Sequence, residues 1–211
     1  MPTFEIESHH KGFVGGIDEA GRGPWAGPVV AAAAVFLDPS ILPPSLLDGI
    51  QDSKKLTKTK RENIYHKLME LKSFHYGIGL ASVDEIDSMN ILKATFLAME
   101  RATHALPQKP ETLLIDGKYI PSFKGIRTFP VIGGDGISLS IAAASILAKV
   151  TRDKIMAELS ETFPSYGWER NAGYGTAEHQ EALKIHGITS HHRKSFAPIK
   201  ALLAPPEEFF S

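Results

Sequence analysis

Apolar residues follow two spacings along the chain, and these predict strands and helices. Short apolar runs rich in β-branched and aromatic residues predict strands at residues 13–18, 28–37, 74–81, 112–116 and 127–132. Longer segments with apolar positions three or four residues apart predict helices at residues 57–71, 90–105 and 138–159. Two strands first, and then strands mixed with helices, indicate an α/β domain with a mixed central sheet flanked by helices.

Polar residues mark helix starts, and a change of composition marks the last part of the chain. Thr57 precedes one predicted helix, and Ser82 with Glu85 three residues later is a capping-box signature. After residue 163 the chain is rich in Gly, Tyr, Trp and His and carries two short helical patterns, at 177–186 and about 195–203. We expect a main domain over residues 1–160 and a small C-terminal helical extension over residues 161–211.

Composition places the protein among ordinary globular domains. The 211 residues are 43% hydrophobic and 22% charged, and no apolar run reaches the ~20 residues of a membrane span. The first residues, MPTFEIESHHK, do not resemble a secretory signal. The absence of cysteine excludes disulfides, zinc–thiolate sites and thiol nucleophiles, and it suits a reducing compartment. We therefore expect a cytoplasmic protein with no membrane association, and a monomer by default.

Charge is nearly balanced overall but unevenly placed. The net charge is −1, which excludes a global basic field for nucleic acid. Residues 53–61 hold five basic residues and no acid, and residues 186–200 hold Arg193, Lys194 and Lys200 with no acid. Local basic patches bind phosphate even in neutral proteins, but on their own these segments favour solvated surface. The doublets His9–His10 and His191–His192 have no partner with metal-ligand spacing, so surface loops are expected for them too.

Carboxylates stand at the ends of predicted strands. Asp18 and Glu19 close the first strand, Asp116 closes TLLID, and Asp135 follows two glycines before the long helix. Strand ends are where sites form in open α/β sheets, and converging carboxylates repel one another unless a hard cation lies between them. This pattern favours a site for Mg²⁺ or Mn²⁺ that acts on a phosphodiester.

Structural roles for the same acids stay open. Asp135 could cap the following helix, and Asp116 could be a turn residue. Asp18 and Glu19 would point to opposite faces of a regular strand, so a shared site requires the strand to end or bend between them. The glycines that follow make such a bend inexpensive.

A glycine-rich turn follows the acidic pair. In GGIDEAGRGPWAGP, Gly21 and Gly23 flank Arg22, so that the backbone can approach a ribose or phosphate closely. Tyr174, in NAGYGT, could stack on a sugar or base. A tight turn and a half-buried tyrosine are the alternatives. Ser145 and His179 lack the context of a hydrolase nucleophile and base, so that chemistry is not expected.

Taken together, the motifs resemble those of the ribonuclease HII family. They are GIDEAGRGPWAGPVV, DSKKL, LLIDG, GGDGISLSIAAASILAKVTRD, GYGTAEH and HRKSF, in this order over nearly the whole chain. The type HIII enzymes are less similar and carry an extra N-terminal domain. The resemblance implies an RNase H-like fold with a C-terminal helical extension. It implies Mg²⁺- or Mn²⁺-dependent hydrolysis of the RNA strand of RNA–DNA hybrids, and cleavage 5′ of single ribonucleotides embedded in duplex DNA.

The resemblance also assigns roles to residues. It implies that Asp18, Glu19, Asp116 and Asp135 are catalytic metal ligands, and that Gly21, Arg22 and Gly23 read the ribose 2′-hydroxyl and its phosphates. Tyr174 would stack on the ribonucleotide. Candidate phosphate contacts are Lys54, Lys55, Ser145, Lys149 and Lys194. Gly133 is a departure, because many relatives have a basic residue there.

Two other classes of function remain open on the sequence. A non-catalytic nucleic-acid-binding module gains nothing from carboxylates that face phosphates. A metal-dependent nuclease of DNA would share the acidic site, but it has no use for a ribose-sensing turn. The C-terminal LLAPPEEFFS is expected to be a loose tail rather than a docking peptide.

Overall fold

The computed structural model describes residues 1–203 and places a five-stranded mixed sheet at the centre of the molecule. Its order is β3 (Phe74–Ala81), β2 (Val29–Phe36), β1 (Val14–Ala20), β4 (Thr112–Asp116) and β5 (Arg127–Val131). The strands β1, β2 and β3 pair antiparallel, whereas β4 runs parallel to both β1 and β5. The carboxyl ends of β1 and β4 therefore lie at the same edge of the sheet.

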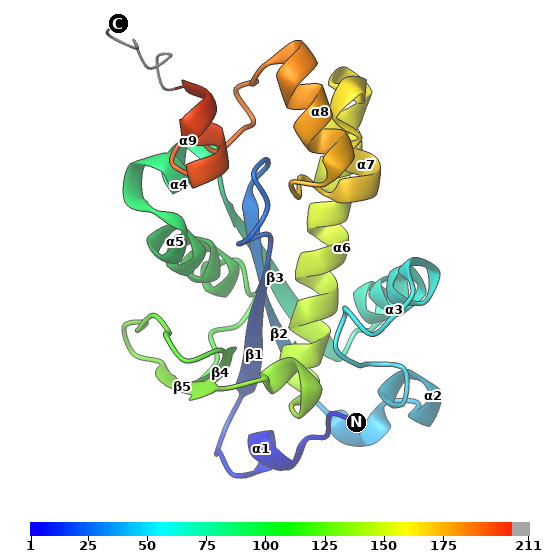
Figure 1. Ribbon diagram of the computed structural model, residues 1–211. Coiled ribbons are helices and arrows are strands. Elements are labelled where there is room, and N and C mark those ends of the chain that lie inside the picture. Colours follow the sequence, from blue (N-terminus) through cyan, green and yellow to red (C-terminus); the bar gives the residue numbers. More distant parts are fainter. Residues whose placement is uncertain (204–211) are drawn as a thin grey trace, which may run out of the picture.

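Helices cover both faces of this sheet, as predicted (Figure 1). One core packs α6 (Leu139–Thr162) and α3 (Lys58–Glu70) against one face, with Ala32 and Ala34 of β2 between them. The other core packs α4 (Val83–Met89) and α5 (Ile91–His104) against the opposite face, with Ala31 and Ala33. The alternation of β2 residues between the two cores follows from the two-residue period of a strand.

Glycine brings α6 into close contact with β1. A Cβ atom at Gly16 would meet the backbone of Ser140 and Ile141 at the start of α6. The missing side chain therefore lets the helix lie directly on the strand, two residues before Asp18 on the same face. The N-terminal half of α6 is thereby fixed beside the carboxyl end of β1.

Most predicted caps and elements are confirmed, and β1 differs in its end. Thr57 caps α3 through the N–H of Lys60, and Ser82 and Glu85 form the capping box of α4. The strand β1 continues through Ala20 instead of ending at Asp18, because Asp18 and Glu19 still pair with Ala32 and Ala31 of β2. Three short helices were not predicted: α1 (Glu5–Ser8), α2 (Pro44–Leu47) and α7 (Trp168–Asn171). None of the helices within residues 1–203 has the length and apolarity that a bilayer crossing requires.

The last part of the described chain packs on a third core. It contains α7 (Trp168–Asn171), α8 (Ala177–His186) and α9 (Ala197–Leu203), and its centre joins Trp168, Tyr166 and Ile199 to Ala26 from the turn after β1. The helix α6 crosses residue 160, and the division of domains there stays a prediction. The tail expected at the C-terminus falls, from residue 204 on, outside the described residues.

A chain of hydrogen bonds between neutral histidines lies in this third core. The N–H of Thr189 donates to Nδ1 of His192 (2.9 Å), so the ring proton of neutral His192 lies on Nε2, which is 3.0 Å from Nε2 of His179. That His179 atom also accepts from Trp168 (3.3 Å), and Nδ1 of His179 donates to the carbonyl of Tyr174 (3.0 Å). The expectation of a surface loop is wrong for His192, which is fully buried.

Burial of these rings makes the stability of the protein depend on pH. Burial, and then the neighbouring His179, lower the pKa of His192 to about 4. In the unfolded chain the same group titrates near pH 6.5, so on acidification the unfolded state takes up a proton that the folded state does not. We expect the free energy of unfolding to fall between about pH 6.5 and about pH 4, by up to ~1.4 kcal/mol per pH unit for this proton.

The substitution His192→Gln removes this titration and should flatten the pH dependence between about pH 7 and pH 5. Urea denaturation at several pH values measures the slope. The matched control is His66→Gln, because His66 is exposed on α3 and should leave the slope unchanged. Equal slopes for the wild type and His192→Gln would contradict the assignment.

Candidate active site

Acidic side chains from separate segments reach one edge of the sheet. Parallel pairing of β1 with β4 ends at Ile17 and Ile115, so Asp18 and Asp116 are the next residues of their strands at that edge. Asp135 lies in the 3₁₀ turn Gly134–Gly136 just before α6. The N–H of Gly134 donates to Oδ1 of Asp116 (2.7 Å), which ties this turn to the end of β4. We call Asp18, Glu19, Asp116 and Asp135 the acidic edge.

Asp18 and Glu19 both belong to the acidic edge although they are neighbours on a continuous strand. Asp18 lies on the α6 side and is buried, and its Oδ1 accepts the backbone N–H of Glu19 (2.7 Å). Glu19 leaves the strand in the other direction, but it stands beyond the last residue of β1 that β4 covers. Its carboxylate interacts with Asp116 and accepts from Arg22 (3.2 Å). The open end of the sheet, not a bend in the strand, lets both acids act at one edge.

Mutual repulsion and burial both act on these carboxylates. Burial first, and then Glu19 and Asp116, raise the pKa of Asp18 well above its usual value. Burial raises the pKa of Glu19, and Asp116 adds to this against the opposing effect of Arg22. The pKa of Asp135 is raised by burial and then by Asp52 and Asp116. A cation among these oxygens would relieve the repulsion.

Lys54 supplies part of this positive charge. Its Nζ lies 3.7 Å from Oδ2 of Asp135. Burial lowers the pKa of Lys54, but Asp18, Asp135, Asp52 and Asp116 together raise it above its usual value. Within residues 1–203, no three His, Cys, Asp or Glu side chains already converge on one point as a preassembled metal site. The fit to a divalent metal therefore depends on the chemistry of the donors, which are hard carboxylate oxygens under mutual repulsion.

Asp52 is an acidic neighbour that the sequence analysis missed. Its negative charge raises the pKa of Asp135. Its Oδ1 also accepts the N–H of Lys54 (2.9 Å), which shapes the turn that presents the lysine. The motif DSKKL contains this acid, but only its lysines were predicted to be functional, as phosphate contacts. The position of Asp52 at the start of a basic run is the sequence feature that could have indicated its role.

A basic pocket lies beside the acidic edge. It has a volume of about 450 Å³, and Glu19 is the acid in its lining. The other lining residues that concern the site are Gly21, Arg22, Gly23, Lys54, Arg61, Ser145, Lys149, Arg152 and Tyr174. The ring of Tyr174, 49% exposed, lies close to Gly23. The turn, the tyrosine and two of the predicted lysines therefore surround one cavity.

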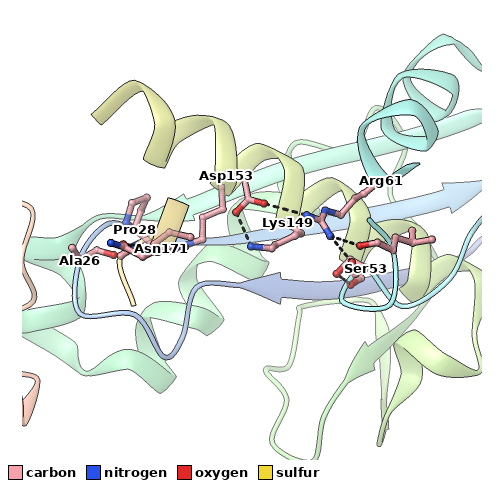
Figure 2. A network of polar contacts seen from close by, with 12 residues as sticks. Ala26, Pro28, Ser53, Arg61, Lys149, Asp153 and Asn171 are labelled. Carbon is pink, nitrogen blue, oxygen red and sulfur yellow. Dashed lines mark hydrogen bonds and ion pairs between the residues drawn. The ribbon is translucent and has the colours of Figure 1, made fainter. Parts of the chain in front are cut away.

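A polar network fixes the side chains along one wall of this pocket. Figure 2 shows Lys149 and Asp153 of α6 between Arg61 and Ser53 on one side and Ala26 and Pro28 on the other. Nζ of Lys149 donates to Asp153 (2.7 Å), and Arg61 donates to the carbonyl of Ser53 (2.6 Å) and pairs with Asp153 (3.6 Å). The hydroxyls of Ser53 and Ser145 are hydrogen-bonded to each other at 2.7 Å. This network holds the DSKKL turn against α6.

Other predicted contacts lie outside the pocket or are buried. Lys55 and Lys194 are exposed and do not line it, and the backbone N–H of Lys194 donates to Asp87 (2.9 Å). The interpretation of both basic segments as solvated surface is wrong for Arg61 and Arg193, which are buried. Their partners are backbone carbonyls brought close only by the fold, so the basic pattern alone gave no signal of burial.

The sequence is similar to those of known proteins over nearly its whole length. The sequence profile named Ribonuclease HII matches residues 15–199. The ribonuclease HII of Gluconobacter oxydans (strain 621H) is 53% identical over 204 residues, which cover 96% of this chain and 97% of that protein. The ribonuclease HII of Paramagnetospirillum magneticum (strain AMB-1) is 56% identical over 200 residues, covering 94% and 97%.

A solved structure is similar to this one in its fold. The crystal structure of the ribonuclease H2 from Pyrococcus horikoshii OT3 is similar with a TM-score of 0.70 and 28% identity, over 90% of this chain and 96% of that one. The mixed sheet flanked by helices is thus an RNase H-like fold. On its sequence and its structure alike, the chain belongs to the ribonuclease HII family, and it is a ribonuclease H endonuclease.

Proposed function

We propose that this endonuclease depends on Mg²⁺ or Mn²⁺, cleaves the RNA strand of RNA–DNA hybrids, and cuts 5′ of a single ribonucleotide in duplex DNA. Its products are a 3′-hydroxyl and a 5′-phosphate. The observation that carries this proposal is the juxtaposition of the acidic edge with a basic pocket whose wall includes a glycine turn. Carboxylates serve a metal, cations serve phosphates, and a bare backbone serves a sugar.

The acidic edge would hold the metal. Asp18, Glu19, Asp116 and Asp135 offer hard oxygens from β1, β4 and the turn before α6. Burial with mutual repulsion raises the pKa of Asp18, Glu19 and Asp135 in the absence of a cation. The chemistry supplied by a bound divalent cation is a nucleophilic water at neutral pH and neutralisation of charge that develops on the phosphate. The chain itself contributes orientation, because the N–H of Gly134 donates to Asp116 and the N–H of Glu19 donates to Asp18.

The basic pocket would hold the nucleic acid. Lys54 and Lys149 line it and would contact phosphates, while exposed Lys55 and Lys194 would reach the backbone of the duplex farther away. Gly21, Arg22 and Gly23 would meet the ribose 2′-hydroxyl and its phosphates, and Tyr174 beside Gly23 would stack on the ribonucleotide. This arrangement selects for a sugar that carries a 2′-hydroxyl.

A single assay tests the proposal. A labelled DNA duplex with one ribonucleotide, incubated with Mg²⁺, with Mn²⁺ or with EDTA, reports the position of the cut and the need for metal. We expect one cut on the 5′ side of the ribonucleotide with either metal and none in EDTA. An all-DNA duplex of the same sequence should stay intact. Equal cleavage of the all-DNA duplex would favour a DNA nuclease. Cleavage in EDTA would contradict the dependence on a divalent metal.

We expect Asp18→Asn to lower cleavage at least about 100-fold, because it removes a charged ligand of the cation that would neutralise the reacting phosphate. Binding to an RNA–DNA hybrid, measured by fluorescence anisotropy, should stay within a few-fold of wild type. The matched control is Glu100→Gln on the exposed side of α5, which should cleave normally. Turnover of Asp18→Asn near the wild-type rate would contradict the assignment of Asp18 as a metal ligand.

We expect Tyr174→Ala to reduce cleavage at a single embedded ribonucleotide by about tenfold or more, because it removes a stacking surface that is half exposed in the free protein. Thermal unfolding should change little, since the ring is not part of a core. Tyr174→Phe keeps the stacking face and should keep most of the rate. An unchanged rate in Tyr174→Ala would make this residue structural.

A further inference from the structure

Two buried arginines lie directly behind the glycine turn. Arg193 is 0% exposed and Arg152 is 1% exposed, and within residues 1–203 neither forms an ion pair with a carboxylate. Burial lowers the pKa of Arg193 to about 9, with Arg152 adding to the effect, and burial lowers the pKa of Arg152 to about 10. Both therefore stay charged at neutral pH. Burying two like charges is costly unless strong hydrogen bonds compensate.

Backbone carbonyls provide that compensation. Arg193 donates to the carbonyls of Gly21 (2.6 Å), Arg22 (3.1 Å), Gly27 (2.9 Å) and Pro28 (3.2 Å). Arg152 donates to those of Pro28 (3.0 Å), Ala26 (3.0 Å) and Ala172 (2.9 Å). All but one of these acceptors lie in residues 21–28, which we call the glycine loop. The planar fork of arginine suits several carbonyls at fixed angles, as an ammonium group does not.

These contacts determine where the N–H groups of the loop point. In a planar trans peptide the carbonyl and the following N–H point in opposite directions. Because the carbonyls of Gly21 and Arg22 face Arg193, the N–H groups of Arg22 and Gly23 face away from it. Within residues 1–203 neither N–H donates to another protein group, and both residues line the basic pocket.

The segment that carries Arg193 is itself held in place by α4 and by the glycine loop. The N–H of Arg193 donates to the carbonyl of Trp25 (2.8 Å), and Asp87 of α4 accepts from the N–H groups of Lys194 and Ser195 (both 2.9 Å). The guanidinium also lies 5.0 Å from the centre of the Phe196 ring. The position of the arginine is thus determined by α4 and by the glycine loop together.

We propose that Arg193, supported by Arg152, is a positioning residue that orients the glycine loop so that the N–H groups of Arg22 and Gly23 face the nucleic acid. The proposal rests on the proposed function, in which this loop reads the ribonucleotide. It assigns to the C-terminal extension a part in recognising the sugar, although the guanidinium of Arg193 does not line the basic pocket. Without Arg193 the loop carbonyls lose their partners and the peptide planes are free to turn.

The test compares Arg193→Met with Tyr166→Phe. Arg193→Met keeps an apolar side chain of similar length and removes every donor. Tyr166→Phe removes one hydrogen bond to the carbonyl of Gly187 (2.9 Å) elsewhere in the extension, so it controls for a general loss of stability. Two quantities are measured in EDTA: hydrogen exchange of peptides covering the glycine loop, and the ratio of Kd values for an all-DNA duplex and the same duplex with one ribonucleotide.

We expect hydrogen exchange in the loop to speed up at least tenfold in Arg193→Met, and the Kd ratio to fall toward one, while Tyr166→Phe keeps both near wild type. Arg193→Lys, which keeps the charge without the fork, should fall between them. With metal present, KM for the single-ribonucleotide duplex should rise more than kcat falls. If Arg193→Met does not fold, Asp87→Ala frees the same segment and should change both measurements in the same direction.

The two proposals fail in different ways. Loop exchange and a Kd ratio that match the wild type in Arg193→Met overturn the positioning role. Faster loop exchange with an unchanged Kd ratio also overturns it, because the loss of order in the loop would then have no effect on recognition. A wild-type protein that binds both duplexes equally refutes the reading of ribose by this loop. The orientation of the loop by Arg193 is then decided by hydrogen exchange alone.

Discussion

Repulsion between carboxylates at one end of the sheet is the constraint on which the rest of this molecule depends. Asp18 is buried against α6, and its neighbours Glu19 and Asp116 both oppose its charge. Such a cluster weakens folding unless other groups compensate. The structure supplies compensation from three directions: the ammonium of Lys54, the N–H of Gly134 and the N–H of Glu19. The turn DSKKL, the 3₁₀ turn and the end of β1 are therefore all arranged around one electrostatic problem.

A second electrostatic cost lies close by and has the opposite sign. Arg152 and Arg193 are buried beside each other, and backbone carbonyls take the place of carboxylate partners. Their positive charge lies beside the basic pocket, where it would favour an approaching phosphate. A carboxylate partner would have cancelled this charge. The two buried arginines thus share one end of the molecule with the carboxylates without pairing with them, because both guanidinium groups bond to the backbone.

Local patterns predicted the elements well, and tertiary contacts decided what they missed. The capping box at Ser82 and the acids at strand ends carry short-range signals, and the resemblance of motifs extended these to the family. The continuation of β1 through Glu19 was missed because it depends on pairing with Ala31 and Ala32, which lie beyond a turn. Burial of Arg193 and His192 was missed for a related reason. The carbonyl partner Gly21 of Arg193 lies far away in the sequence, and the hydrogen bond of His192 depends on the tautomer of the His179 ring.

The hydrogen bond from His179 to the carbonyl of Tyr174 has a consequence for how this architecture can vary. Tyr174 and Arg193 both follow α6 in the chain, whereas the carboxylates come from β1, β4 and the turn before α6. A graft of residues 161–203 from a relative would carry the aromatic ring and the guanidinium together as one cassette. The carboxylates and the glycine loop would stay with the host, so such a chimaera would join a ring and a guanidinium from one parent to a loop from the other.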